Sequence, residues 1–353
     1  MQIIYFILLL GVIILVHEIG HLLVAKFFGV YCGEFAIGMG PKLFSIKKKE
    51  TTYSIRAIPI GGFVTMAGDD FEEKDIPVER TLPGIHPLKR IAIMLAGIVM
   101  NFLLAWIVMS SIIIMNGSVN LPPEPVIIGV IENSPASEAG LQEGDIIRKI
   151  EYSDGTVIHP RDFYEILNYN SLYTDERMMT IERDGKLFTI KITPAYFEKD
   201  NQYLIGIPIP PAGSKPVNFI ESFQYGAIYT ANVTTDTFNA LTRLVRGIGL
   251  NQLSGPIGIL NVTGEIMSQA NSFVEGLKYF LNLVAVMSAN VAIFNLLPLP
   301  IMDGGRVLIT VIEMIIRKPV NKKLEQMLML GSMALMMLLM LFVTYQDIFN
   351  IFK

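Results

Sequence analysis

Cysteine is nearly absent from the sequence, since Cys32 is the single one among 353 residues. An intramolecular disulfide is therefore excluded, and so is a zinc cage built from several cysteines. Any metal ligands would have to be histidines and carboxylates. Charge is also scarce, because Asp, Glu, Lys and Arg make up 17% of the chain and the net charge is −4. This balance gives no support for a nucleic-acid partner.

Hydrophobic residues, in contrast, are abundant. They account for 52% of the chain, and the mean hydropathy is +0.48. A soluble globular protein is usually less apolar than this, so the composition predicts a multi-pass α-helical membrane protein that sits in a lipid bilayer.

Four apolar runs are long enough to be transmembrane helices. The first run has no basic residues before its apolar core and no small-residue cleavage site after it, so we expect a retained helix instead of a signal peptide. The expected transmembrane segments are residues 1–30, 91–116, 276–316 and 324–350.

The first run contains the motif His17-Glu18-Ile19-Gly20-His21. Two histidines four residues apart share one face of a helix, about 6 Å apart, which suits two ligands of a tetrahedral Zn²⁺. Glu18 would then be able to act as a base on a water molecule at the metal. Ionisable residues inside a membrane span are costly, so a functional reason is the default interpretation.

Basic residues indicate the orientation. The run at 47–49 and the pairs at 89–90, 317–318 and 322–323 are expected to face the cytoplasm. Both chain termini would then lie outside the cytoplasm.

Residues 31–70 are too polar for a span. Their β-branched and aromatic residues, punctuated by glycine and proline, favour short strands and turns. This segment either returns towards the proposed metal as a membrane-associated, re-entrant β segment or forms a simple cytoplasmic hairpin. A charged, cytoplasmic loop is expected at 71–90.

Between the second and third spans the composition becomes that of a soluble domain. Residues 124–195 carry strand-like runs and the pattern SPASEAGLQEGD at 134–145, which resembles a bacterial PDZ domain. We therefore expect an inserted, extracytoplasmic α+β domain of PDZ type that either binds a peptide or acts as a spacer. Residues 196–275 are expected to form an amphipathic extracytoplasmic region with a helical pattern around 219–245.

The third span must break at Pro298 and Pro300, because proline removes backbone hydrogen-bond donors. A broken membrane helix that carries Asn295 and Asp303 is a place where a functional site is expected. Asn101 lies near the centre of the second span, and it either bonds a neighbouring helix or reaches the active site.

Three separated motifs thus coincide: HEIGH in the first span, NLLPLPIMDGG at 295–305 and the PDZ-like segment between them. With GGFVTMAGDD at 61–70, they make the chain resemble the bacterial site-two proteases, which are intramembrane zinc proteases that act on membrane-bound anti-sigma factors. The resemblance covers nearly the whole chain. Met302 stands where the family usually has leucine, and Ile98 replaces the proline of the family's GPxxN motif.

The resemblance implies a function and a set of roles. The function is cleavage within transmembrane segments of single-span proteins, such as anti-sigma factors or remnant signal peptides, in a bacterial inner membrane. His17, His21 and Asp303 are implied as zinc ligands and Glu18 as the catalytic base. Asn295 is implied as a residue that positions the substrate, and Asn101 would share this role if it reaches the active site.

Two other classes of function compete with this interpretation. One is a metal-dependent transporter with an ion path through the broken span, although the chain lacks repeated halves. The other is a catalytically silent scaffold in which the PDZ-like domain is the working part.

Overall fold

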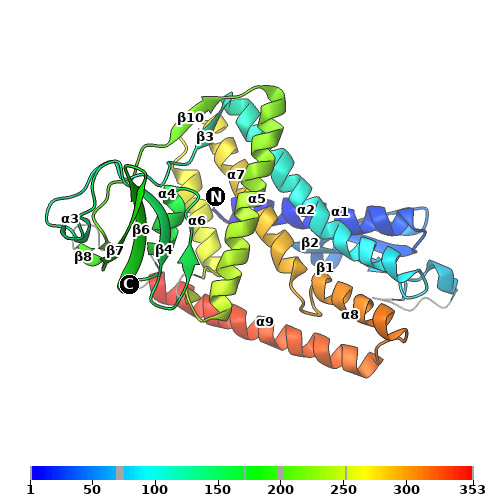
Figure 1. The fold of residues 1–353 in the computed structure, drawn as a ribbon. Coiled ribbons are helices and arrows are strands. Elements are labelled where there is room, and N and C mark those ends of the chain that lie inside the picture. The colour runs from blue at the N-terminus through cyan, green and yellow to red at the C-terminus, as the bar shows by residue number, and fades with distance from the viewer. Residues whose placement is uncertain (1, 69–74, 171, 198–201, 251–252, 352–353) are drawn as a thin grey trace. The chain divides into compact units, whose positions relative to one another are not determined.

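A computed structural model describes residues 2–68, 75–170, 172–197, 202–250 and 253–351 (Figure 1). The chain divides into two compact units. The first unit contains residues 1–115 and 218–353, and the second unit contains residues 116–217.

Four long apolar helices belong to the first unit: α1 (Gln2–Phe27), α2 (Pro87–Asn116), α7 (Phe273–Leu296) and α9 (Lys322–Ile351). The shortest, α7, has 24 residues, and about 20 apolar residues are enough to cross the hydrocarbon layer. Among the described residues, these four helices are long and apolar enough to span a membrane, in agreement with the expected number of spans.

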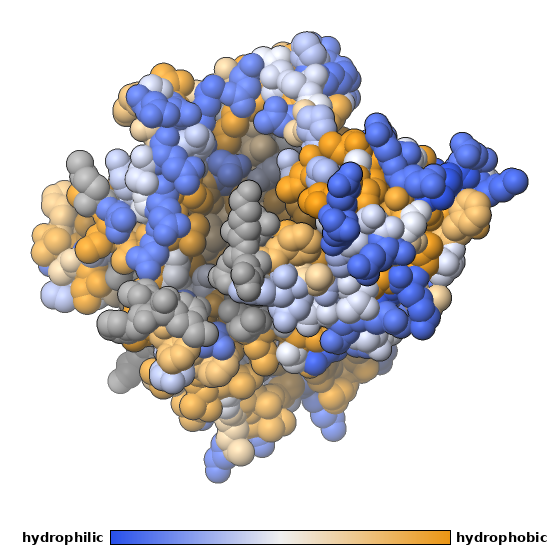
Figure 2. Space-filling view, turned by 90° about the vertical axis from the view of Figure 1, so that its left-hand side faces the viewer, coloured by the Kyte–Doolittle hydropathy of each residue, from blue (hydrophilic) through white to orange (hydrophobic). Residues whose placement is uncertain are grey.

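Large apolar side chains remain exposed on these helices in the isolated chain, among them Leu23, Ile107 and Leu341. Figure 2 shows broad hydrophobic areas beside hydrophilic ones on one face of the molecule. Side chains of this kind face lipid in a bilayer, so their exposure agrees with a membrane protein.

One face of α1 is buried along its length. The buried residues on this face are Leu9, Ile13, His17, His21 and Ala25. Residues four apart lie above one another on a helix, so the two histidines continue an apolar packing stripe into the interior.

After α1 the chain forms two long strands, β1 (Cys32–Lys48) and β2 (Thr51–Met66), in place of the expected short strands. Gly38, Gly40 and Gly61 have φ angles of 85°, 82° and 86°. Glycine alone adopts such angles without strain, so the chain bends inside the strands without ending the pairing.

Strand β1 is paired along both of its edges near its start. Phe35 pairs with Val64 on one side and with Tyr53 on the other. Phe35 and Val64 are buried in one apolar cluster with Leu22 and Ile93, from α1 and α2. The end of β2, residues 62–66, is therefore held next to the helices of the first unit.

A short 3₁₀ helix, η1 (Val78–Arg80), precedes α2. Residues 71–74 of the expected loop lie outside the described residues. Helix α2 begins at Pro87, earlier than the expected start at 91. The missing N–H of a proline is not needed in the first helical turn, so Pro87 can begin the helix.

The second unit contains an antiparallel sheet with the strand order β5-β4-β6-β7. These strands are β4 (Ile146–Glu151), β5 (Val157–Ile158), β6 (Arg177–Arg183) and β7 (Lys186–Ile192). Two helices, α3 (Pro135–Glu138) and α4 (Phe163–Asn170), complete the α+β unit. Ile147, Ile150, Phe163 and Met179 are buried in its core.

The second unit extends beyond the expected boundaries of 124–195. The reason is that β3 (Ser118–Leu121) pairs with β10 (Gly213–Pro216) and closes the two ends of the insertion. Another strand pair, β8 (Ala195–Phe197) and β9 (Gln202–Leu204), precedes this closure.

The expected single amphipathic region at 196–275 is in fact divided between the units. Its end forms helices α5 (Phe219–Val245) and α6 (Pro256–Ser268) of the first unit. Helix α5 is tied to α7 by two hydrogen bonds between side chains: Tyr229 Oη to Asn282 Oδ1 at 3.3 Å, and Thr237 Oγ1 to Asn290 Oδ1 at 2.7 Å. Polar groups on one face of α5 thus pack against α7.

Candidate active site

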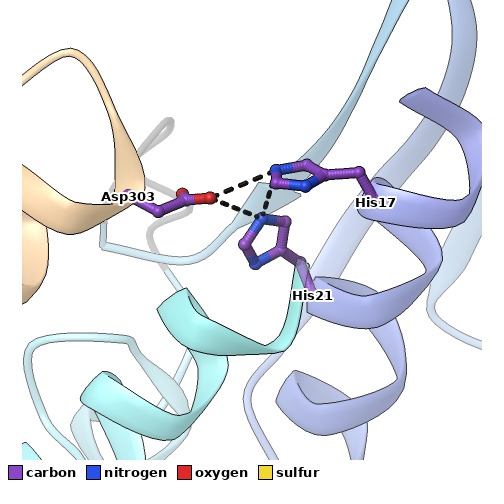
Figure 3. A group of neighbouring side chains, drawn as sticks. All are labelled: His17, His21 and Asp303. Atoms are coloured by element: carbon purple, nitrogen blue, oxygen red, sulfur yellow. Dashed lines mark hydrogen bonds and ion pairs between the residues drawn. The ribbon is translucent and has the colours of Figure 1, made fainter. Parts of the chain in front are cut away.

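Three ionisable side chains from two distant parts of the chain meet in the first unit (Figure 3). His17 and His21 come from α1, and Asp303 is the first residue of α8 (Asp303–Ile316). His17 Nε2 lies 3.1 Å and His21 Nε2 lies 3.4 Å from Asp303 Oδ2. The two Nε2 atoms are 3.1 Å apart, and both histidines are buried.

The spacing of these three atoms fits one tetrahedral metal ion. Ligand atoms about 2.0 to 2.1 Å from a tetrahedral Zn²⁺ are about 3.3 to 3.4 Å apart, and the observed separations are close to this. Oδ2 of Asp303 is buried and accepts no well-formed hydrogen bond from any described residue. Two imidazoles and one carboxylate are also the donor set of catalytic zinc sites, so the residues present fit this metal.

Asp303 reaches the histidines because the chain breaks between α7 and α8. Helix α7 ends at Leu296, and the prolines at 298 and 300 prevent the helix from continuing. A Cβ atom on Gly304 would lie 2.2 Å from Leu296 O, and one on Gly305 would lie 2.1 Å from Leu299 O. Glycine is therefore required at both positions for α8 to fold back against the break.

Helix α2 provides contacts behind the histidines. His21 Nδ1 donates a hydrogen bond to Ile93 O at 2.8 Å, which leaves its Nε2 without a proton and directed at Asp303. The sequence reasoning did not identify Ile93, because the contact uses a backbone carbonyl and no side-chain pattern marks it.

A cavity of about 490 Å³ opens beside the three side chains. Glu18, Asn295 and residues 62–66 of β2 line it together with His17, His21 and Asp303. Asn295 also donates from Nδ2 to Val291 O of its own helix at 3.0 Å.

The structure thus brings five of the expected site residues to one cavity: His17, Glu18, His21, Asn295 and Asp303. Asn101 is different, because it is fully buried behind His17. Arg306 also lines the cavity and was not identified from the sequence. Its position one helical turn after Asp303 was the signal that could have found it.

A His-His-Asp cluster beside apolar helices of membrane-spanning length is the ligand set expected of a membrane metalloprotease. The sequence profile of peptidase family M50 matches residues 5–339 of the chain. The chain belongs to this family. Membership makes it a metalloendopeptidase, and zinc is the cofactor that its relatives' names give.

Curated relatives match over nearly their whole length. A protein of Clostridium perfringens with a provisional zinc metalloprotease name is 36% identical over 350 residues, which cover 99% of this chain and 98% of that protein. The regulator of sigma-W protease RasP of Bacillus subtilis is 32% identical, with 99% of both chains covered. The zinc metalloprotease RasP of Bacillus licheniformis is 31% identical, again with 99% of both covered.

The two RasP alignments extend over 432 positions, whereas this chain has 353 residues. The Bacillus proteins therefore contain residues that have no counterpart here.

Proposed function

We propose that the protein is an intramembrane endopeptidase in which His17, His21 and Asp303 hold the zinc ion and Glu18 is the catalytic base. The observation that carries this proposal is the convergence of the three ligand atoms, within 3.4 Å of one another, beside a span. Zinc, when bound, lowers the pKa of a water molecule towards about 7 and polarises the scissile carbonyl. Glu18 lines the same cavity, where it would accept a proton from the attacking water and return it to the leaving amine.

The substrate would enter as an extended segment. A helical transmembrane substrate has its carbonyls hydrogen-bonded internally, so it must unwind before attack. Residues 62–64 line the cavity, and among the described strands they pair with β1 alone. Their other edge can receive one strand of the substrate through backbone hydrogen bonds. Asn295, which lines the same cavity, would position the bond to be cleaved.

The substrates would be single-span membrane proteins. One relative carries the name regulator of sigma-W protease, which supports an anti-sigma-factor-like protein as the substrate of this chain as well. Remnant signal peptides have the same physical character, a single apolar segment that must be cleaved within the bilayer.

The second unit is proposed to be a PDZ-like domain. Its SPA sequence begins α3, where Ser134 Oγ accepts a hydrogen bond from Ser137 N and caps the helix. The Asp of its GD pair, Asp145, is buried beneath β6. The basic clusters that are expected to face the cytoplasm support a location of this unit and of both termini outside it. The membrane would be a bacterial cell membrane.

Co-expression with single-span substrates tests the activity. Wild type should cleave within the substrate's span, whereas Glu18→Gln should retain zinc but not cleave, because an amide cannot accept the proton. Normal cleavage by Glu18→Gln would remove Glu18 from the mechanism. A silent scaffold or a transporter would show no cleavage in either form.

Cysteine labelling tests the orientation. In a Cys32→Ser background, a cysteine at position 153 should react with an impermeant reagent from outside. A cysteine at position 48 should react only after the membrane is permeabilised. The reverse pattern would overturn the orientation and place the second unit in the cytoplasm.

A further inference from the structure

One stripe of α2 faces the two histidines. Ile93, Gly97 and Asn101 follow one another at intervals of four residues, so they share one face of the helix. Ile93 O accepts from His21 Nδ1 at 2.8 Å, and the amide of Asn101 lies 3.3 Å from His17 Nδ1. Each histidine therefore meets one polar group of α2 on the side away from Asp303.

Gly97 lies between these two contacts and brings the helices together. A Cβ atom at this position would lie 2.5 Å from His21 Nε2 and 2.6 Å from His17 Cε1. On the other side of the contact, a Cβ atom on Gly20 would lie 2.5 Å from Ala96 O. The buried imidazoles are thus held against the backbone of α2.

His17 requires a hydrogen-bond acceptor at Nδ1. For Nε2 to offer its lone pair to a metal ion shared with Asp303, the proton of the neutral ring must be on Nδ1. The side-chain group next to His17 Nδ1 is the amide of Asn101, whose Nδ2 is directed towards the ring. The Oδ1 atom of the same amide is buried and has no hydrogen-bond partner among the described residues. Rotating the amide by half a turn exchanges the two atoms, and such exchanges are not distinguished by atom positions.

We propose that Asn101 is a positioning residue that accepts a hydrogen bond from His17 Nδ1 through Oδ1 and thereby fixes the ring for metal binding. In the rotated amide, Asn101 Oδ1 and His17 Nδ1 become each other's hydrogen-bond partners. Asn101 is fully buried and is not among the residues that line the cavity, so it does not meet the substrate. Ser288 Oγ of α7 donates to the backbone O of Asn101 at 2.9 Å and holds this turn of α2 in place.

This inference rests on the proposed function, because it concerns the affinity of the chain for zinc. The test uses the purified full chain in detergent and measures the zinc dissociation constant by competition with a chromophoric chelator. The melting temperature of the metal-free protein is measured on the same preparations. Three variants are compared with wild type: Asn101→Leu, Asn101→Asp and Ser110→Ala.

Asn101→Leu keeps the branching and the number of heavy atoms of the side chain but removes the acceptor, so zinc should bind about 10- to 100-fold more weakly, as for other partners of metal-bound histidines. Asn101→Asp offers an oxygen in either rotamer and should restore affinity to the wild-type value or better. Ser110 is a buried polar residue of α2 that bonds Trp106 O of its own helix. Ser110→Ala should therefore leave the zinc affinity unchanged.

Equal zinc affinities for the leucine and aspartate variants would overturn the inference, whether both equal wild type or both are weaker. A lower melting temperature of metal-free Asn101→Leu with unchanged zinc affinity would show a packing role and would also overturn it. If the leucine variant does not fold, Asn101→Ala replaces it in the same comparison. Wild type that binds no zinc would instead refute the proposed function itself.

Discussion

Two carboxylates, the buried Asp145 of the second unit and the partly buried Asp303 of the first unit, differ in how their oxygens are hydrogen-bonded. The carboxylate of Asp145 in the second unit accepts hydrogen bonds from Arg183 Nε at 2.6 Å, Arg183 Nη2 at 2.7 Å and Gln142 N at 2.9 Å. Asp303 of the first unit faces two imidazoles, and its Oδ2 accepts no well-formed hydrogen bond from the described residues.

The comparison separates a structural carboxylate from one arranged for a ligand. Burial by itself raises the pKa of Asp145, but the hydrogen bonds from Arg183 and Gln142 outweigh burial and hold the pKa below its ordinary value. Both carboxylate oxygens of Asp145 accept hydrogen bonds from the chain itself, so Asp145 has a structural role. Asp303 and the two imidazoles are three groups that can share one cation, which is the arrangement of a metal site.

The largest effect is expected from Asp303→Asn. The amide keeps the shape but loses the negative charge, so zinc binding should weaken by at least about 100-fold and cleavage should fall to background. Zinc content and cleavage are measured on one preparation. Because Asp303 lies in the first unit, hydrogen exchange of the second unit should not change.

Retention of wild-type zinc content by Asp303→Asn would remove this residue from the ligand set. A matched control is Glu313→Gln, also on α8, whose carboxylate binds Arg90 at 2.6 Å instead of the histidines. This control should keep its zinc.

Asn295→Ala should have the next largest effect. If the amide positions the substrate, the cleavage rate should fall on the order of 10²-fold, with zinc content and melting temperature near wild type. Its hydrogen bond to Val291 O supports a competing role in capping the broken helix. Joint loss of activity, zinc and thermal stability would favour the structural role and end the substrate assignment.

Asp145→Asn should act on stability and leave zinc unchanged. The variant loses a charge-assisted pair with Arg183, so amides of β4 and β6 should exchange faster with deuterium. The exposed Glu143→Gln serves as the control with no expected effect. Weaker zinc binding in Asp145→Asn would break the distinction between the two carboxylates.

The smallest expected effect is a pH dependence of the stability of the second unit around β4 and β6. Because the folded pKa of Asp145 lies below its ordinary value, its contribution to stability is present at neutral pH and is lost as the pH falls below about 4. Exchange in β4 and β6 should accelerate over this range in wild type. In Asp145→Asn the exchange rates of β4 and β6 should depend less on pH. The same pH dependence in the variant and in wild type would contradict the contribution of Asp145 to stability.

Local sequence patterns predicted much of the first unit. The apolar runs predicted four spans, and helical periodicity placed His17 and His21 on one face of α1. Proline predicted the break of α7, because a missing donor disrupts a helix anywhere beyond its first turn. These properties depend on residues close together along the chain, so the sequence alone determines them.

Contacts between distant residues were decided only by tertiary structure. The approach of Asp303 to His17 joins positions far apart in the chain, and a family resemblance, not spacing, implied it. The bend of the β1–β2 hairpin depends on how its glycines pack, and the pairing of β3 with β10 set the limits of the second unit. The Ile93 carbonyl and the buried amide of Asn101 act on the histidines only because Gly97 lets α2 approach α1, a close packing that no local pattern in the sequence expresses.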